Sequence, residues 1–160
     1  MLVFLLGERH KYKTQGEELL ENICSRYYLR DTIDYTTYYA YWHPVPTRID
    51  ERPRDTRRQE LMAHWLETFS NPIIVGFGWI SGDLLFHVAK SRMNSHIGCK
   101  WIIEGQSEKR AWLTYDPNHA LYDPGIVCDI AGTIVTAAKE DGYVIKIDKT
   151  VKPYTWEKFL

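Results

Sequence analysis

Two acidic residues follow apolar segments of the chain, and each has a histidine close behind it. Glu8 stands just after the apolar opening of the sequence, and Asp116 stands just after a second apolar run. His10 and His119 follow them closely. A carboxylate can orient water and stabilise positive charge, and an imidazole can transfer a proton near neutral pH. These four side chains are therefore candidates for acid–base chemistry.

The same residues also have ordinary structural interpretations. Glu8 could cap a helix or solvate a loop, and Asp116-Pro117-Asn118 is a common turn sequence. A lone histidine is more often a surface or capping residue than a catalytic one. The histidines show no His-x-x-x-His or similar fixed spacing, so we expect no metal site.

Segments typical of strands alternate with segments typical of helices along the chain. We predict strands at 2–6, 33–42, 73–78, 97–103, 111–115 and 143–147, and helices at 15–28, 56–69, 80–88 and 123–138. Thr56 is expected to cap the second helix, and Gly142 is expected to end the last one. Such alternation is typical of a parallel sheet covered by helices. We predict an α/β fold, a three-layer α/β/α sandwich with a central, mainly parallel sheet of about four strands, in a single domain over residues 1–160.

The composition fits a globular domain without bulk attraction to nucleic acid. At 160 residues, 44% hydrophobic and 26% charged, the chain can bury a core. Its formal net charge of −1 and its pI near 6.6 argue against binding nucleic acid through bulk charge. Any such contact must therefore come from a local basic patch.

The cysteines and the apolar opening indicate a cytoplasmic protein. Cys24, Cys99 and Cys128 are far apart and odd in number, so they form neither a disulfide framework nor a four-thiolate metal site. This pattern favours a reducing compartment. The apolar opening is too short for a membrane span and lacks the basic leader of a signal peptide. We expect no contact with a membrane.

The C-terminal half carries motifs in a definite order: an apolar run ending in glycine at 73–78, Gly-Cys-Lys-Trp at 98–101 and Thr-Tyr-Asp-Pro at 114–117. Together they resemble the uracil-DNA glycosylase superfamily, especially its shorter bacterial and archaeal branch. Residues 73–78 are similar to the apolar strand and Leu-Gly of that branch, and the following 84–85 resembles its helix. Gly-Cys-Lys-Trp at 98–101 resembles the family's Arg-Gly-Lys-Trp segment. Residues 113–124 are similar to its Thr-Tyr-His-Pro motif with the trailing Leu and Asn-Pro.

The N-terminal half matches in the same order, so the resemblance spans roughly residues 2–140. Residues 4–8 resemble the strand and the Gly-Glu that open the family's water-activating loop. Thr36-Thr37 falls where the family has Thr-Asn, and 43–48 resembles its Arg-Pro-Pro loop. The resemblance implies the uracil-DNA glycosylase fold.

The chain departs from the family at its active-site positions. Arg9, His10 and Lys11 replace Ala-Pro-Gly, Thr37 replaces the asparagine that reads the uracil edge, and Asp116 replaces the histidine of the His-Pro motif. No cysteine pair precedes the first strand, so we expect neither the iron–sulfur cluster of the branch nor another cofactor. These changes put excision of plain uracil in doubt.

The resemblance implies roles for the candidate residues. Glu8 would orient water, Asp116 would read or polarise the base, and His119 or His10 could supply the lost imidazole. We expect Thr37, Tyr39 and Tyr41 to hold the base, because an extruded base is commonly stacked on an aromatic face.

Cations near these motifs are candidates for contact with DNA. Charge runs are more often solvated faces, but a local basic group could grip phosphates beside the base. The candidate DNA-binding residues are Arg9, Lys11, Arg48, Arg52, Arg54 and Lys100. We expect single- or double-stranded DNA as the partner of a monomer.

Three functions remain open at this stage. The first is a DNA glycosylase that hydrolyses the N-glycosidic bond of a modified or deaminated base. The second is a catalytically inactive module that keeps the pocket and binds DNA, a base or a nucleotide. The third is a hydrolase of free nucleosides or nucleotides.

Overall fold

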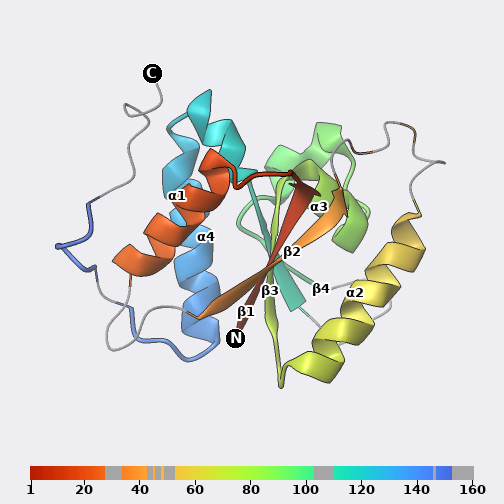
Figure 1. Cartoon of the computed structure of the whole chain (residues 1–160), viewed down its shortest axis with the longest axis horizontal. Coiled ribbons are helices and arrows are strands. Elements are labelled where there is room, and N and C mark those ends of the chain that lie inside the picture. Colours follow the sequence, from red (N-terminus) through yellow and green to blue (C-terminus); the bar gives the residue numbers. More distant parts are fainter. Residues whose placement is uncertain are drawn as a thin grey trace.

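A five-stranded, mostly parallel sheet forms the centre of the molecule in a computed structural model (Figure 1). The structure describes residues 1–27, 34–42, 45, 48, 53–102, 110–145 and 147–152. The strand order is β2-β1-β3-β5-β4. The strands are β1 (Leu2–Arg9), β2 (Tyr35–Trp42), β3 (Ile73–Phe77), β4 (Lys100–Ile102) and β5 (Arg110–Thr114). All neighbouring pairs are parallel except β4 with β5, so the antiparallel strand lies at one edge.

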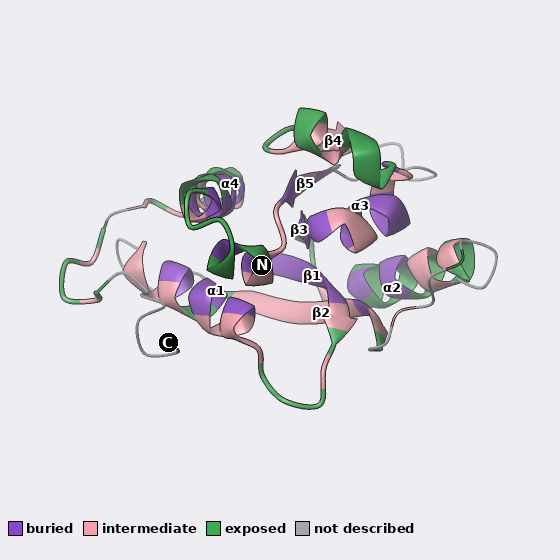
Figure 2. Ribbon diagram, turned by 90° about the horizontal axis from the view of Figure 1, so that it is seen from above, coloured by how far each residue is buried: buried purple, intermediate pink, exposed green. Residues whose placement is uncertain are grey.

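The helices cover both faces of this sheet. They are α1 (Gln15–Arg26), α2 (Arg54–Thr68), α3 (Gly78–Phe86) and α4 (Ile126–Glu140), with short 3-10 helices η2 (Lys90–His96) and η3 (Pro117–Leu121). Figure 2 shows α1 and α4 on one side of the strands and α2 and α3 on the other. The arrangement is an α/β fold compatible with a three-layer sandwich, as predicted, with five strands rather than about four.

Alternation along β1 divides the core between the two faces. Leu2, Phe4 and Leu6 are buried in a cluster with α1 and α4. Val3 and Leu5 are buried in a second cluster with α2 and α3. Each fully buried side chain of this size contributes about 1.5–3 kcal/mol of hydrophobic stabilisation. A strand covered on both faces therefore lies at the centre of the fold, as its apolar sequence predicts.

Two details at the helix ends differ from the sequence-based expectation. Thr56 lies inside α2, which begins at Arg54 and has no side-chain cap. The strong cap is instead at α1, where Thr14 and Glu17 form a reciprocal capping box. Gly142 follows the end of α4 with a φ of +92°, which confirms its predicted role.

The expected strand at 143–147 is wrong for the described residues. Tyr143 and Ile145 pack against the cluster of α1 and α4, and the hydroxyl of Tyr143 accepts a hydrogen bond from the backbone N–H of Asp34. Ile147 forms only an isolated bridge with Tyr27. The alternating pattern therefore reflects packing on the core, not pairing at a sheet edge.

Candidate functional site

The described helices include none with the length and apolar character needed to cross a membrane.

The candidate catalytic residues lie at the edge of the sheet where the carboxyl ends of its parallel strands meet. The chain runs from β1 to β2 on one side and returns to β3 on the other side of β1. Such a change of direction leaves a crevice beyond the strand ends, where open α/β sheets bind ligands.

A cavity of about 430 Å³ lies at this edge. It is lined by Gly7, Glu8, Phe77, Gly78, Trp79, Ile80, Lys90, Met93, Asn94, Tyr115, Asp116 and His119. The volume lies within the range of small-molecule sites. We call it the Glu8 cavity. It brings together Glu8, Asp116 and His119, the three residues predicted to be catalytic, from the ends of β1 and β5 and from η3.

Two glycines allow α3 to lie against the cavity. A Cβ at Gly7 would come within 3.0 Å of Cβ of Ile80, so this position lets α3 approach β1 closely. The hydroxyl of Ser81 donates a 2.8 Å hydrogen bond to the carbonyl of Leu5 and fixes that approach. Gly78 has a φ of +85°, and a Cβ there would come within 3.0 Å of Cβ of Asp116. The first turn of α3 therefore fits between the two acidic residues.

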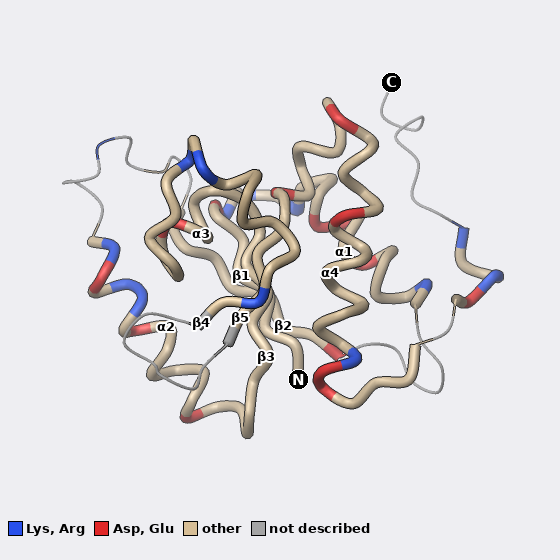
Figure 3. The backbone as a smooth tube through the Cα atoms, turned by 180° about the vertical axis from the view of Figure 1, so that it is seen from behind, with Lys and Arg blue, Asp and Glu red and all other residues tan. Residues whose placement is uncertain are grey.

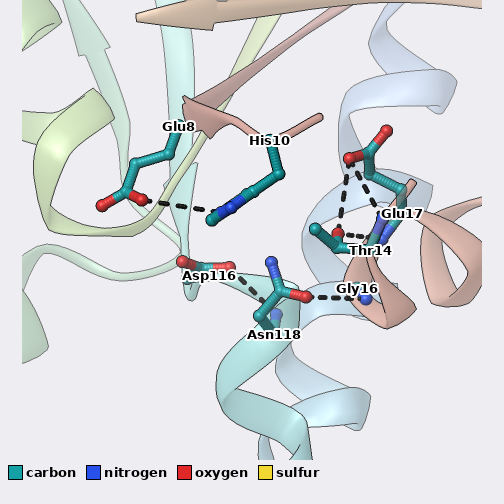
Figure 4. Close-up of polar contacts among 7 residues, drawn as sticks. All are labelled: Glu8, His10, Thr14, Gly16, Glu17, Asp116 and Asn118. Carbon is teal, nitrogen blue, oxygen red and sulfur yellow. Dashed lines mark hydrogen bonds and ion pairs between the residues drawn. The ribbon is translucent and has the colours of Figure 1, made fainter. Parts of the chain in front are cut away.

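Asp116 is held by a hydrogen-bonded turn. Its Oδ1 accepts a 2.9 Å hydrogen bond from the backbone N–H of Asn118, so the side chain caps η3. Oδ1 of Asn118 accepts a 2.8 Å hydrogen bond from the backbone N–H of Gly16 at the start of α1 (Figure 4). The ordinary turn expected of Asp-Pro-Asn is thus present, and it places the carboxyl group on the cavity wall.

The surroundings of Asp116 raise its pKa. Burial raises the pKa of this carboxyl above its usual value, and the nearby Glu8 carboxylate raises it further. The hydrogen bond from Asn118 and the positive charge of His119 oppose this rise without cancelling it. At a given pH, Asp116 therefore carries a proton more often than an exposed aspartate does.

Glu8 lies closer to solvent than Asp116 does. Its Oε2 is 3.5 Å from Nε2 of His10, and the two side chains are 29% and 35% exposed (Figure 4). The two groups form an ion pair when the imidazole is protonated. Glu8 and the half-buried Asp116 thus line one cavity, and burial raises the pKa of Asp116, an arrangement suited to dividing base and acid roles between them.

Thr37, Tyr39 and Tyr41 lie apart from the Glu8 cavity. They line a hollow of about 600 Å³ between β2 and α2. Thr37 pairs with Phe4 in the middle of β1, well before the strand end that carries Glu8. The hydroxyl of Tyr39 donates a 2.8 Å hydrogen bond to Oε2 of Glu17. Burial, and then this bond, raise the pKa of Tyr39 to about 12.

The aromatic side chains on the wall of the Glu8 cavity are Phe77, Trp79 and Tyr115. The sequence interpretation missed them because it searched only the aromatic-rich segment of β2. Their position at strand ends was the available signal, since Phe77 is the last residue of β3, Trp79 comes two residues later and Tyr115 directly follows β5.

The predicted DNA-binding cations lie in different places. Arg9 lies over the ring of Trp42 at 4.4 Å, and Lys11 lies over the ring of Tyr12 at 5.5 Å. Lys100 pairs with Glu140 at the far end of α4. Arg48 is exposed, and Arg52 lies outside the described residues.

The cations of α2 serve mainly to hold the fold together. Figure 3 shows acidic and basic positions side by side on this helix. Arg54 forms a 2.9 Å ion pair with Asp83 of α3. Arg57 donates to the carbonyls of Tyr39 and Ala40 at the edge of β2. Arg54 and Arg57 are therefore engaged in contacts within the protein.

No three His, Cys, Asp or Glu side chains gather into a metal-binding group within the part of the chain that the structure describes. The remaining chemistry of the site is that of two carboxyl groups, an imidazole and a set of aromatic faces. Comparison with known proteins found that no family model and no curated protein matches this chain.

Proposed function

We propose that the protein is a DNA glycosylase that hydrolyses the N-glycosidic bond of a modified or deaminated base. The observation that carries the proposal is that Glu8 and Asp116, from separate parallel strands, line one cavity. The strand order and the ordered motifs of the sequence support a uracil-DNA glycosylase-like fold for the domain.

The base would enter the Glu8 cavity after the nucleotide has left the stack. Trp79 and Tyr115 provide aromatic faces on which a base can stack, and the buried Phe77 lies behind them in the core. Asn94, at the mouth of the cavity, carries an amide that can both donate and accept hydrogen bonds. These groups replace the base-holding set that we predicted from β2.

The two carboxyl groups divide the reaction between them. Protonated Asp116 transfers its proton to the departing base as the C1′–N bond breaks and the electron pair of that bond moves to the base. The carboxylate of Glu8 stabilises the cationic sugar and accepts a proton from water as the new C1′–O bond forms. Proton exchange with solvent then restores both groups.

His119 also lies on the cavity wall, where it can contact the departing base. Its positive charge opposes the rise in the pKa of Asp116. A protonated imidazole can also donate to an anionic base, the role of the family histidine that Asp116 replaces. His10 steadies Glu8 from the outer side.

A binding module without catalysis is the second candidate. The observation that favours it is the N-cap formed by Asp116, because that role needs no reaction. In this case the cavity would hold a base or nucleotide and leave the glycosidic bond intact.

The experiment that separates the two candidates is a substrate screen. Single- and double-stranded oligonucleotides carrying uracil, hypoxanthine, xanthine or alkylated bases are incubated with stoichiometric protein, and abasic sites are then cleaved. Excision of at least one base is expected. Inertness towards every oligonucleotide, with binding retained, would leave the binding module as the correct description.

A further inference from the structure

A second hollow surface lies beside the Glu8 cavity. It consists of two adjoining hollows, of about 770 Å³ and 600 Å³, that share Arg9, Tyr39 and Trp42. The larger hollow also includes Lys11 and Tyr12 from the loop after β1. We call this surface, defined by these five residues, the Arg9 groove.

The groove displays aromatic rings to solvent. Tyr12 is 75% exposed and Trp42 is 65% exposed, which is unusual for side chains of this size. Each ring has a cation over its face, Lys11 on Tyr12 and Arg9 on Trp42. Exposed rings beside cations are the combination with which proteins hold unpaired bases and their phosphates.

The groove also has a local excess of positive charge. The three carboxylates that line the two hollows already have partners within the protein. Glu17 binds the hydroxyl of Tyr39 and caps α1, Glu21 pairs with Lys13, and Glu60 lies 3.6 Å from Arg57. The cationic heads of Arg9 and Lys11 lie over rings and form no ion pair within the described part of the chain. They can therefore contact an anionic chain without first losing an acidic partner.

The groove adjoins the Glu8 cavity at His10. His10 lines the groove, and its Nε2 lies 3.5 Å from Oε2 of Glu8 in the cavity. Glu8 and Arg9 are adjacent at the end of β1, yet Glu8 lines the cavity and Arg9 lines the groove. A DNA strand with one nucleotide in the cavity could pass over His10 into the groove.

We propose that the Arg9 groove binds the single-stranded DNA that continues from the extruded nucleotide. Bases of this strand stack on Trp42 and Tyr12, and Arg9 and Lys11 contact its phosphates. Stacking on these rings requires unpaired bases, so the groove selects a single strand over a duplex. This inference rests on the proposed function, because it takes DNA as the substrate of the Glu8 cavity.

The test measures binding of an unmodified strand, which needs no excision. A fluorescent oligothymidylate is titrated with the full chain, and anisotropy is followed at several salt concentrations. Trp42→Ala and Tyr12→Ala should each weaken binding by roughly 5- to 150-fold, and Trp42→Phe should restore most of the loss. Arg9→Ala and Lys11→Ala should reduce the dependence of affinity on salt. A duplex of the same length should bind more weakly than the single strand.

Matched controls lie outside the groove. Tyr122→Ala removes a ring that is 83% exposed, and Lys139→Ala removes an exposed cation on α4. Neither control should change the affinity. Wild-type affinity of Trp42→Ala and Tyr12→Ala, an equal loss in Tyr122→Ala, or a preference for duplex would overturn the proposal.

The outcome is distinguishable from failure of the proposed function. Binding that depends on Trp42, together with no excision of any base, would support strand binding in the groove and contradict the glycosylase activity. Excision by the wild-type protein, together with normal strand binding by Trp42→Ala and Tyr12→Ala, would contradict strand binding in the groove and support the glycosylase activity.

Discussion

The backbone N–H of Gly16 donates a 2.8 Å hydrogen bond to Oδ1 of Asn118, and this bond joins the start of α1 to the turn that holds Asp116. A Cβ at position 16 would come within 2.6 Å of that oxygen. Gly16→Ala should therefore displace Asn118, lower the free energy of unfolding by about 1–3 kcal/mol and reduce any activity that depends on Asp116. Chemical denaturation and excision assays measure the two effects.

Gly132→Ala is the matched control for this prediction. Gly132 also lies in a helix, α4, but a Cβ there meets no atom within 4 Å among the described residues. The substitution should raise stability by about 0.5–1 kcal/mol, because alanine favours a helix interior over glycine. If both variants changed stability alike, the contact of Gly16 with Asn118 would have no special role.

The raised pKa of Asp116 predicts a pH dependence of stability. Since the folded protein binds this proton more tightly than the unfolded chain, its contribution to stability is full below the unfolded pKa and is lost as pH rises through the folded pKa. Asp116→Asn should lack this component and keep the cap on η3. Denaturation of both proteins across acidic and neutral pH tests it. A constant difference between their unfolding free energies at every pH would contradict the assignment.

The same carboxyl group predicts a pH dependence of activity. If protonated Asp116 assists the departing base, the rate of excision should fall as pH rises through its raised pKa. Asp116→Asn should be slower and should lose this limb of the pH profile. A wild-type profile that is unchanged in Asp116→Asn would show that another group supplies the hydrogen bond.

Removal of Arg54 should lower stability without changing DNA affinity, and removal of Arg9 should weaken DNA binding with little change in stability. Arg54→Ala removes the 2.9 Å ion pair with Asp83, which is 7% exposed, so it should cost about 1–3 kcal/mol of unfolding free energy. The affinity of the Arg54→Ala variant for DNA should stay at the wild-type value. Arg9→Ala removes an exposed cation and should weaken DNA binding with little change in stability. Thermal unfolding and anisotropy titration of both variants test this contrast.

Much of the fold was predictable because local patterns and tertiary packing agree. The apolar run of β1 and the helical stripes of α1 and α4 bury the residues that the pattern selects, and the stripe of α2 does so except at Leu66, which is 43% exposed. The segment 143–147 was mispredicted because alternation reports which residues are buried, not what buries them. Tyr143 and Ile145 alternate against a helix-covered core instead of a neighbouring strand.

The acidic pair of the site was also predictable, because Glu8 and Asp116 follow strands that the sequence marks clearly. Their convergence follows from the rule that parallel strands end at one edge. The position of Thr37 was not predictable in the same way, because it depends on the register between β1 and β2. That register places Thr37 beside Phe4, away from the strand end. Pairing of Arg54 with Asp83 likewise depends on how α2 and α3 pack together.

The most direct test of the account is single-turnover excision by Glu8→Gln on the best substrate of the screen. Glu67→Gln, at an exposed position on α2, is the control. Glu8→Gln should lose the excision rate by orders of magnitude while it folds and binds the same oligonucleotide like wild type, and Glu67→Gln should retain the full rate. Excision by Glu8→Gln at the wild-type rate would contradict the central claim that Glu8 and Asp116 work together on one glycosidic bond.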